Sequence, residues 1–266
     1  MKVQLWIVAV VLCSVSLMVS ALPVSVFVVH CEPTNANPAM WLELVDLVLQ
    51  ADRYSIPLSI YFTPQWAEMI SADEDKVAML ETWLASGHEI GCHHHGYWGT
   101  KDRGSTWDGY TNTPLEELDV EDRGRFLGTM EDFMEILNVL PGKRRSGCLG
   151  GANSSDDIDY PCQLEYSTNG HNLDDVAAAP EAIERNGCQI IEIGHGLIAN
   201  QERGVLRNLY STTSERVVFG VVGHVYNYAD FPAVFVEWFR FLHELDKEGA
   251  SRGTVSNILD AWETAP

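Results

Sequence analysis

The sequence Pro23-Val-Ser-Val-Phe-Val-Val-His30 is short, apolar and rich in β-branched residues, which indicates a buried β-strand. Residues 38–52 then carry apolar side chains at helical spacing, and residues 57–62 form a second strand-like run. Residues 73–86 are predicted to form a helix, and His88-Glu-Ile-Gly-Cys-His93 a third strand. Strands that alternate with helices in this way predict a parallel sheet built from βα units.

The same alternation continues to the end of the chain. Further strands are predicted at residues 146–149, 164–168, 188–193 and 217–222, and further helices at residues 114–138, 177–185, 231–247 and 254–263. About seven strand–helix units in about 245 residues fit a closed or partly closed barrel better than an open sheet. The predicted fold is therefore α/β, an irregular (β/α) barrel of about seven parallel strands. It occupies one domain, residues 22–266.

The N-terminus has the features of a secretory signal peptide. Lys2 is followed by an apolar run that ends at Val19, and Val19-Ser-Ala21 fits a cleavage site. A short membrane anchor is the alternative interpretation of this segment. We expect residues 1–21 to be removed and the protein to be secreted or periplasmic, with no membrane association afterwards.

The charge balance is strongly acidic. The chain has 17 basic and 38 acidic residues, which give a formal net charge of −21. A chain this acidic repels nucleic acid and anionic membranes, so neither is expected as a partner. Hydrophobic residues make up 46% of the chain, which predicts a globular protein rather than a disordered one. No feature of the sequence indicates an oligomeric state.

Five cysteines follow the predicted signal peptide: Cys31, Cys92, Cys148, Cys162 and Cys188. An odd number outside the cell leaves at least one thiol free or in an intermolecular bond. Cys148 and Cys162 both lie in a loop-rich stretch, which allows a bridge between them. Cys31 and Cys92 are expected to be unbridged and to pack outside the barrel, because roughly 9–10 Å separates strands two apart in a sheet. The absence of any Cys-x-x-Cys pair argues against a thiolate zinc site.

Residue types that bind metals gather where the predicted strands end. His30-Cys-Glu32 closes the first strand, and His93-His-His95 closes the third. Side chains alternate along a strand, so His30 shares a face with Glu32, and His93 shares one with His95. Imidazoles and a carboxylate are the ligands of an open catalytic zinc site, and they also suit Fe(II). A polar loop without a metal is the alternative interpretation of the three histidines.

Two further histidines follow later strands. His224 comes directly after Val217–Gly223, and His195 comes directly after Ile190–Gly194. Either can act as a general acid at the mouth of the barrel, because imidazole titrates near neutral pH. A structural, hydrogen-bonded histidine is the alternative for both, and it is favoured for His195.

These motifs resemble those of the NodB-homology polysaccharide deacetylases, and the resemblance covers nearly all of the mature chain. Gly87-His-Glu-Ile-Gly-Cys-His93 is similar to the family's Gly-His-Glu-Ile-Gly-x-His segment, whose last histidine binds metal. His30-Cys-Glu32 stands where the family has an acidic pair, in which the first member is the catalytic base and the second binds metal. The resemblance therefore makes Glu32 and His93 metal ligands and His30 the base.

The resemblance extends to the second half of the chain. Arg145-Ser-Gly147 is similar to the family's third motif, whose arginine orients the base. Val221-Val-Gly-His224 looks like the last motif, whose histidine is the general acid. Residues 189–192 resemble the penultimate strand, and residues 254–259 resemble the C-terminal helix. Arg145 and His224 thereby join His30 as candidate catalytic residues.

The sequence departs from the family pattern at two positions. The family's second metal-binding histidine comes four residues after the first, where this chain has Tyr97. Some members instead carry a His-x-His-Pro-x-Trp run, to which residues 93–98 are similar, and by this resemblance His95 is the third ligand. His30 replaces the usual aspartate, and it is either the base or a further ligand, with Glu32 then acting as base.

The resemblance implies a metal-dependent hydrolase that acts on carbon–nitrogen bonds other than peptide bonds and removes an acyl group, expected to be acetyl, from a carbohydrate. The expected ion is zinc, with iron, cobalt, nickel and manganese as alternatives. Four aromatic residues of the loop at residues 94–113 are candidates for stacking on sugar rings: Tyr97, Trp98, Trp107 and Tyr110. Two other functions remain open: a carbohydrate-binding protein of this fold that has lost turnover, and a metal-dependent amidase for a C–N bond outside sugars.

Overall fold

A computed structural model of the chain describes residues 22–96, 107–117, 126–150, 158–170, 172–200, 204–213 and 217–264. The predicted signal peptide, residues 1–21, lies outside the described residues. Among the helices that the structure describes, none has the length and apolar character needed to cross a membrane.

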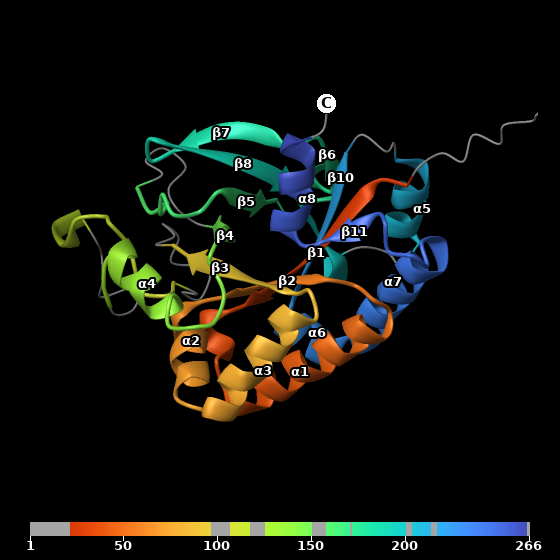
Figure 1. Cartoon of the computed structure of the whole chain (residues 1–266). Coiled ribbons are helices and arrows are strands. Elements are labelled where there is room, and N and C mark those ends of the chain that lie inside the picture. The colour runs from red at the N-terminus through yellow and green to blue at the C-terminus, as the bar shows by residue number, and fades with distance from the viewer. Residues whose placement is uncertain are drawn as a thin grey trace, which may run out of the picture.

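A curled sheet with the strand order β6-β10-β1-β2-β3-β4-β5-β8-β7 forms the centre of the molecule (Figure 1). These strands are β1 (Val24–Cys31), β2 (Leu58–Phe62), β3 (Glu89–His95), β4 (Ser146–Gly150), β5 (Tyr166–Asn169), β6 (Ala177–Ala178), β7 (Glu181–Arg185), β8 (Cys188–Gly194) and β10 (Val218–His224). Every pairing from β10 across to β8 is parallel, whereas β6 and β7 pair antiparallel at the two edges. The predicted α/β fold with a mostly parallel, curled sheet is therefore confirmed.

Two short strands complete the sheet. β9 (Gly196–Leu197) follows β8 in the chain and pairs in parallel with β10. The sheet therefore curls, and the β8 end of the strand order approaches β10 at the other end. β11 (Arg252–Gly253) pairs in parallel with β1. The carboxyl ends of β1 and β10, which are far apart in sequence, consequently lie side by side (Figure 1).

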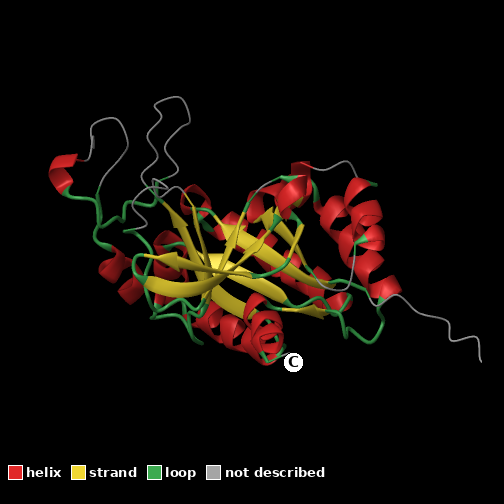
Figure 2. Ribbon diagram, turned by 90° about the horizontal axis from the view of Figure 1, so that it is seen from above, coloured by secondary structure: helices red, strands yellow, loops and turns green. Residues whose placement is uncertain are grey.

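Helices surround the strands, as the view from above shows (Figure 2). They are α1 (Pro38–Arg53), α2 (Pro64–Ser71), α3 (Glu74–Ala85), α4 (Met130–Leu137), α5 (Val205–Thr212), α6 (Val225–Asp230), α7 (Pro232–Leu245) and α8 (Val255–Glu263). The larger core cluster, here called the outer cluster, joins one face of the sheet to α1–α7. A smaller cluster joins the inner face, including Val28, Cys148 and Val222, to α8. Burial on both faces explains why the central strands read as continuous apolar runs.

The helix predicted over residues 114–138 is wrong in its extent. The described part of this stretch holds a short 3-10 turn at Leu115–Glu117 and then α4, which begins only at Met130. The side chain of Thr129 accepts from the backbone N–H of Asp132, whose carboxylate accepts in return from the Thr129 N–H. This capping box fixes the helix start there.

The helix predicted over residues 177–185 is also wrong, because the structure forms β6 and β7 there. β7 and β8 are joined by Asn186-Gly187, whose φ angles are 49° and 73°. Arg185 pairs directly with Cys188 across this two-residue turn. Asn-Gly is the strongest short signal for such a hairpin, and it outweighs the helical propensity of the alanines.

A single disulfide, Cys162–Cys188, is formed by the described cysteines, with the two Cα atoms 5.6 Å apart. The Cys148–Cys162 pairing considered from the sequence is therefore wrong, because the Cys148 side chain belongs to the core on the inner face of the sheet. Cys31 and Cys92 are free, buried and packed in the outer cluster, as predicted.

Candidate metal centre

The candidate site lies at the carboxyl ends of β1, β3 and β10. His30 of β1 is in register with His224 of β10, so the two histidines sit at the same level of the sheet. Alternation along β1 brings Glu32, the residue after the strand, to the same side as His30. The carboxyl edge of a parallel barrel is where active sites form, and the chemical side chains of this chain meet there.

The carboxylate of Glu32 is faced by three imidazole rings. Its Oε1 lies 3.3 Å from Nε2 of His93 and 3.1 Å from Nε2 of His224. Its Oε2 lies 2.7 Å from Nε2 of His95. The Glu32 side chain is only 6% exposed, and its backbone carbonyl accepts a hydrogen bond from the Trp66 indole at 2.8 Å. Burial of a carboxylate costs free energy unless charge or hydrogen bonds compensate, and here the three imidazoles supply that compensation.

His30 lies beneath this carboxylate and is 1% exposed. Its ring stacks on His93 with 4.0 Å between the ring centroids, and it meets His224 edge to face at 5.2 Å. The Nε2 atom of His30 has no hydrogen-bond partner among the described residues. Such a buried polar atom costs about 1–3 kcal/mol when nothing binds it. A residue this deep is better placed to hold an ion than to take a proton from water.

The hydrogen bonds of His93 set how its ring meets Glu32. Its Nδ1 lies 3.0 Å from the backbone carbonyl of Cys148, which can only accept, so Nδ1 carries a proton. The Nε2 atom, on the other side of the ring, faces the Glu32 carboxylate. Either a proton on Nε2 or a metal ion between the two groups makes this contact favourable. Histidines that bind metals usually donate their other N–H to a carbonyl or carboxylate in this way.

Burial and neighbouring charges set the ionisation of these groups. Burial raises the pKa of Glu32, but His93, His224 and His95 outweigh that effect and bring the pKa far below its ordinary value. Burial lowers the pKa of His93 and, together with the nearby imidazoles, that of His30. These directions favour an ionised Glu32 and neutral rings at His30 and His93, which are the forms that bind metals.

The donor set fits a divalent ion. His30, Glu32 and His93 each offer one ligand atom, and these atoms all lie within 4.8 Å of one another. His95 approaches the second carboxylate oxygen from the solvent side, where its side chain is 19% exposed. The structure therefore brings together His30, Glu32, His93, His95 and His224, five of the six residues proposed from the sequence.

Arg145 is the residue that the structure does not bring to the site. It precedes β4 and lies at the amino end of that strand, where its guanidinium pairs with Glu165 and Asp260. It also lies over the ring of Tyr166, 5.2 Å from the centroid. With these partners the side chain cannot orient His30 at the other end of the sheet. The structure therefore gives no support to a role for Arg145 in positioning the base.

The aromatic residues proposed to stack on sugars fall into two groups. Tyr97 and Trp98 lie outside the described residues. Tyr110 is 3% exposed and packs against Phe133 at 5.9 Å, so it belongs to the core, and the Trp107 indole donates to the Tyr110 carbonyl. Tyr110 therefore presents no open face, whereas stacking by the half-buried Trp107 stays a prediction.

Two residues at the site were missed in the sequence. Tyr226 stacks on His224 with 4.9 Å between the ring centroids and is half-buried. Asn227 places its Oδ1 2.9 Å from Nδ1 of His224, which fixes the orientation of that imidazole. Both residues follow His224 in the first turn of α6. The sequence could have pointed to both residues, because they lie two and three positions after the candidate general acid His224.

The middle histidine of the triplet has a different role. His94 points to the other face of β3, where Nδ1 lies 2.8 Å from Asp108 and Nε2 lies 3.8 Å from Asp159. Burial lowers the pKa of His94, but the two aspartates outweigh it and raise the pKa to about 9. Asp108 also accepts from the backbone N–H of His95 at 3.0 Å. This buried ion pair therefore holds the end of β3 in place.

Comparison with known proteins gives a fold but no sequence relative. No family model matches the sequence, and no curated protein matches it. A solved structure named as a polysaccharide deacetylase from Mycobacterium smegmatis aligns with a TM-score of 0.57 and 10% identity, covering 95% of each chain. A polysaccharide deacetylase from Pseudomonas aeruginosa aligns with a TM-score of 0.53 and 12% identity, covering 90% of each chain.

A third solved structure differs in function. The 4-alpha-glucanotransferase from Thermococcus litoralis aligns with a TM-score of 0.55 and 12% identity, over 89% of this chain and 38% of that one. All three likenesses are at low identity and concern the fold. The structure has the NodB-like fold of the polysaccharide deacetylases with which it aligns.

Proposed function

We propose that this protein is a metal-dependent hydrolase that removes an acyl group, with acetyl as the expected case, from a carbohydrate. The observation that carries the proposal is the buried Glu32 carboxylate, which the Nε2 atoms of His93, His95 and His224 face at 3.3, 2.7 and 3.1 Å. Its position at the carboxyl ends of the strands supports an open catalytic site rather than a structural one.

Glu32 and His93 are the proposed ligands, and the geometry favours His30 as the third. His30 is buried against His93, and its ligand atom lies within 4.8 Å of those of Glu32 and His93. We therefore propose that His30 is a metal ligand rather than the catalytic base. When bound, a divalent ion supplies a Lewis acid that polarises the acyl carbonyl and lowers the pKa of a water. Zinc suits two imidazoles and a carboxylate, and iron, cobalt, nickel or manganese are alternatives.

Proton transfer is assigned to the two histidines on the solvent side of Glu32. His95, first considered as a ligand, can accept the proton of the attacking water through Nε2, because its ring is the more exposed of the two. His224 can donate to the leaving amine or alkoxide through Nε2 while Asn227 holds its Nδ1. The half-buried ring of Tyr226, stacked on His224, is the proposed contact for the sugar.

A location outside the cytosol is part of the proposal. The Cys162–Cys188 disulfide supports it, because such bonds persist mainly in oxidising compartments. The signal-peptide features of residues 1–21 point the same way.

The test is acetate release from acetylated chito-oligosaccharides and acetylated xylan, with the metal-loaded protein and its Glu32→Gln and His93→Ala variants. Release by the wild-type protein, lost in both variants, is the expected result. Arg145→Ala is the matched control and should retain full release, because Arg145 lies at the other end of β4.

The two other functions correspond to other outcomes of this assay. Tight metal binding and oligosaccharide binding without release from any acylated sugar would favour a carbohydrate-binding protein, an alternative suggested by His30 at the aspartate position. Release of an amine from small non-sugar amides, without release from acylated sugars, would favour the amidase. Either outcome would contradict the proposed substrate class.

A further inference from the structure

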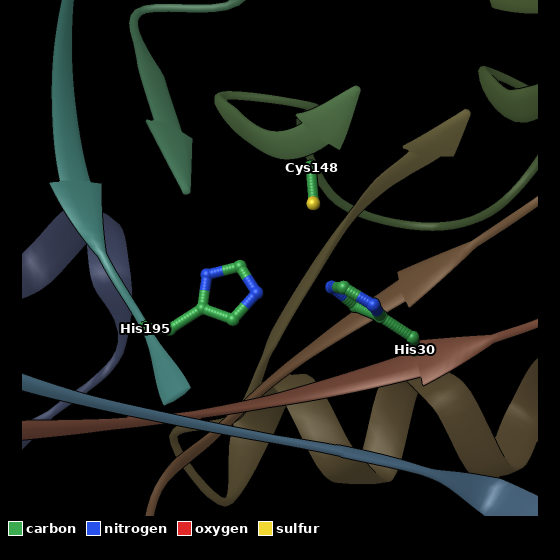
Figure 3. Close-up of side chains that lie close together, drawn as sticks. All are labelled: His30, Cys148 and His195. Atoms are coloured by element: carbon green, nitrogen blue, oxygen red, sulfur yellow. The ribbon is translucent and has the colours of Figure 1, made fainter. Parts of the chain in front are cut away.

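A second group of potential ligands lies in the interior of the curled sheet. His30, Cys148 and His195 each offer one ligand atom, and these atoms all lie within 4.8 Å of one another. Figure 3 shows the Cys148 sulfur and a ring nitrogen of each histidine turned toward the same space. The three residues come from β1, β4 and the residue between β8 and β9, so they converge from distant parts of the chain.

All three side chains are removed from solvent. His30 is 1% exposed, Cys148 is 4% exposed and His195 is fully buried. The hydroxyl of the buried Thr168 lies beside the Cys148 thiol, so polar groups gather around this point of the interior. Cys148 is also distinct from the other two free cysteines, because Cys31 and Cys92 pack in the outer apolar cluster with the helices.

The chemistry of this group differs from that of the Glu32 site. A sulfur with two imidazole nitrogens is a softer donor set than a carboxylate with imidazoles, and it selects zinc, cobalt or copper over calcium, magnesium and manganese. Sequence patterns do not indicate this group, because thiolate zinc sites are usually recognised from paired cysteines. Here the register of β3 with β4 brings a lone cysteine opposite His93, beside the histidine cluster.

His30 belongs to both groups of ligands. An imidazole has two nitrogens, and with a metal on one the other can bind a second ion once its proton is lost. The two sites are therefore compatible, and they remain separable by the residues that they do not share. Glu32 and His93 are specific to one, and Cys148 and His195 are specific to the other.

We propose that His30, Cys148 and His195 form a second, buried metal site that binds zinc or another thiophilic divalent ion. Binding forms a metal–sulfur bond and releases the Cys148 thiol proton to solvent, with no change in oxidation state. When the Glu32 site is filled as well, the ring proton of His30 is released too, because both of its nitrogens then bind metal. The ion ties the ends of β1 and β4 to the β8–β9 junction, across the space that the sheet encloses. This role is structural, since the site is closed to solvent.

The test is titration of the metal-free wild-type chain with Co²⁺. Thiolate bound to cobalt gives an intense charge-transfer band in the near ultraviolet, which carboxylate and imidazole ligands do not give. The band is expected in the wild-type protein, and zinc should abolish it by replacing cobalt. It should fall to background in Cys148→Ser and persist in Cys92→Ser, the matched control from the neighbouring strand, and in Glu32→Gln.

Cobalt content gives a second readout, and it should fall by about one ion per chain in Cys148→Ser and separately by about one in Glu32→Gln. His195→Asn keeps the thiol and should also lose the band, which covers the case of a Cys148 variant that does not fold. A wild-type protein without the band, or a band that survives in folded Cys148→Ser, would overturn the proposal. Acetate release is measured independently, so failure of this site and failure of the proposed function are distinguishable.

Discussion

Nε2 of His93 lies 3.3 Å from Oε1 of Glu32, while Nδ1 of the same ring lies 3.0 Å from the carbonyl of Cys148. A carbonyl that accepts from Nδ1 in this way directs Nε2 at the carboxylate, which is the orientation of a histidine that binds a metal.

Replacement of Glu32 by glutamine is expected to weaken metal binding at its site by at least about 100-fold, because it removes the one anionic ligand proposed among the described residues. Calorimetric titration of the metal-free protein with Zn²⁺ measures the change. Zinc at about 100 times its Kd should stabilise the wild-type protein by about 2.7 kcal/mol. Unchanged zinc affinity in a folded Glu32→Gln variant would show that Glu32 is not a ligand.

Arg145→Ala should leave metal affinity and acetate release unchanged. It should lower the free energy of unfolding by about 1 kcal/mol or less, because the Arg145 pairs with Glu165 and Asp260 are largely exposed to solvent. The loss should shrink as salt is added. Urea unfolding at low and high ionic strength checks the stability, and a loss of activity at unchanged stability would restore the catalytic role.

His94 should contribute strongly to stability through its buried pair with Asp108. His94→Gln removes one partner of this pair and should cost about 3–5 kcal/mol of unfolding free energy. In a double-mutant cycle with Asp108→Asn, the two losses should not add, with a coupling of about 0.5–3 kcal/mol. Additive losses would mean that the ion pair does not hold the end of β3.

His88 should make stability depend on pH. Its Nδ1 accepts from the Leu58 N–H at 3.0 Å and its Nε2 lies 3.0 Å from Asp52, so the buried ring is held neutral. Burial lowers the pKa of His88, although Asp52 partly opposes this. This stabilisation is therefore complete above the pKa of His88 in the unfolded chain, about 6.5, and is lost as the pH falls below it. The loss amounts to about 1.4 kcal/mol for each unit by which folding lowers the pKa of His88.

The measurement is urea unfolding of the wild-type protein and His88→Asn between about pH 7.5 and pH 5. The variant should show a shallower fall in stability with acid than the wild-type protein. Identical slopes would contradict a depressed pKa at His88.

Loss of the Cys162–Cys188 bridge, in a double serine variant, should cost about 3 kcal/mol, because the bridge closes a loop with a sequence separation of 26. Thermal unfolding measures this loss. The bridge lies outside the metal centre, so zinc affinity should be unchanged in the folded variant. A variant that loses zinc binding while it stays folded would show that the bridge shapes the site.

The sequence predicts the central strands well because they are buried on both faces and read as apolar runs. It also predicts that Glu32 and His93 meet, since the carboxyl ends of parallel strands lie at one edge. The helix over residues 177–185 fails because the Asn186-Gly187 turn decides the local structure. The catalytic role predicted for Arg145 finds no support in the structure, because motif similarity does not say at which end of a strand a residue lies.

Cys148 and His195 were beyond sequence reasoning for a different reason. Their proximity to His30 depends on the register of β3 with β4 and on the curl that brings β9 to β10. Register between strands that are distant in sequence comes from the packing of the whole sheet, and no short motif encodes it.

The most direct test of the central claim is an anomalous difference map from crystals grown with Zn²⁺, with data collected on both sides of the zinc absorption edge. The account predicts a zinc peak between the Glu32 carboxylate and Nε2 of His93, within about 2.0–2.2 Å of a ligand atom of each residue. A map with no zinc peak in contact with both residues, from crystals in which zinc is bound elsewhere or not at all, would contradict it.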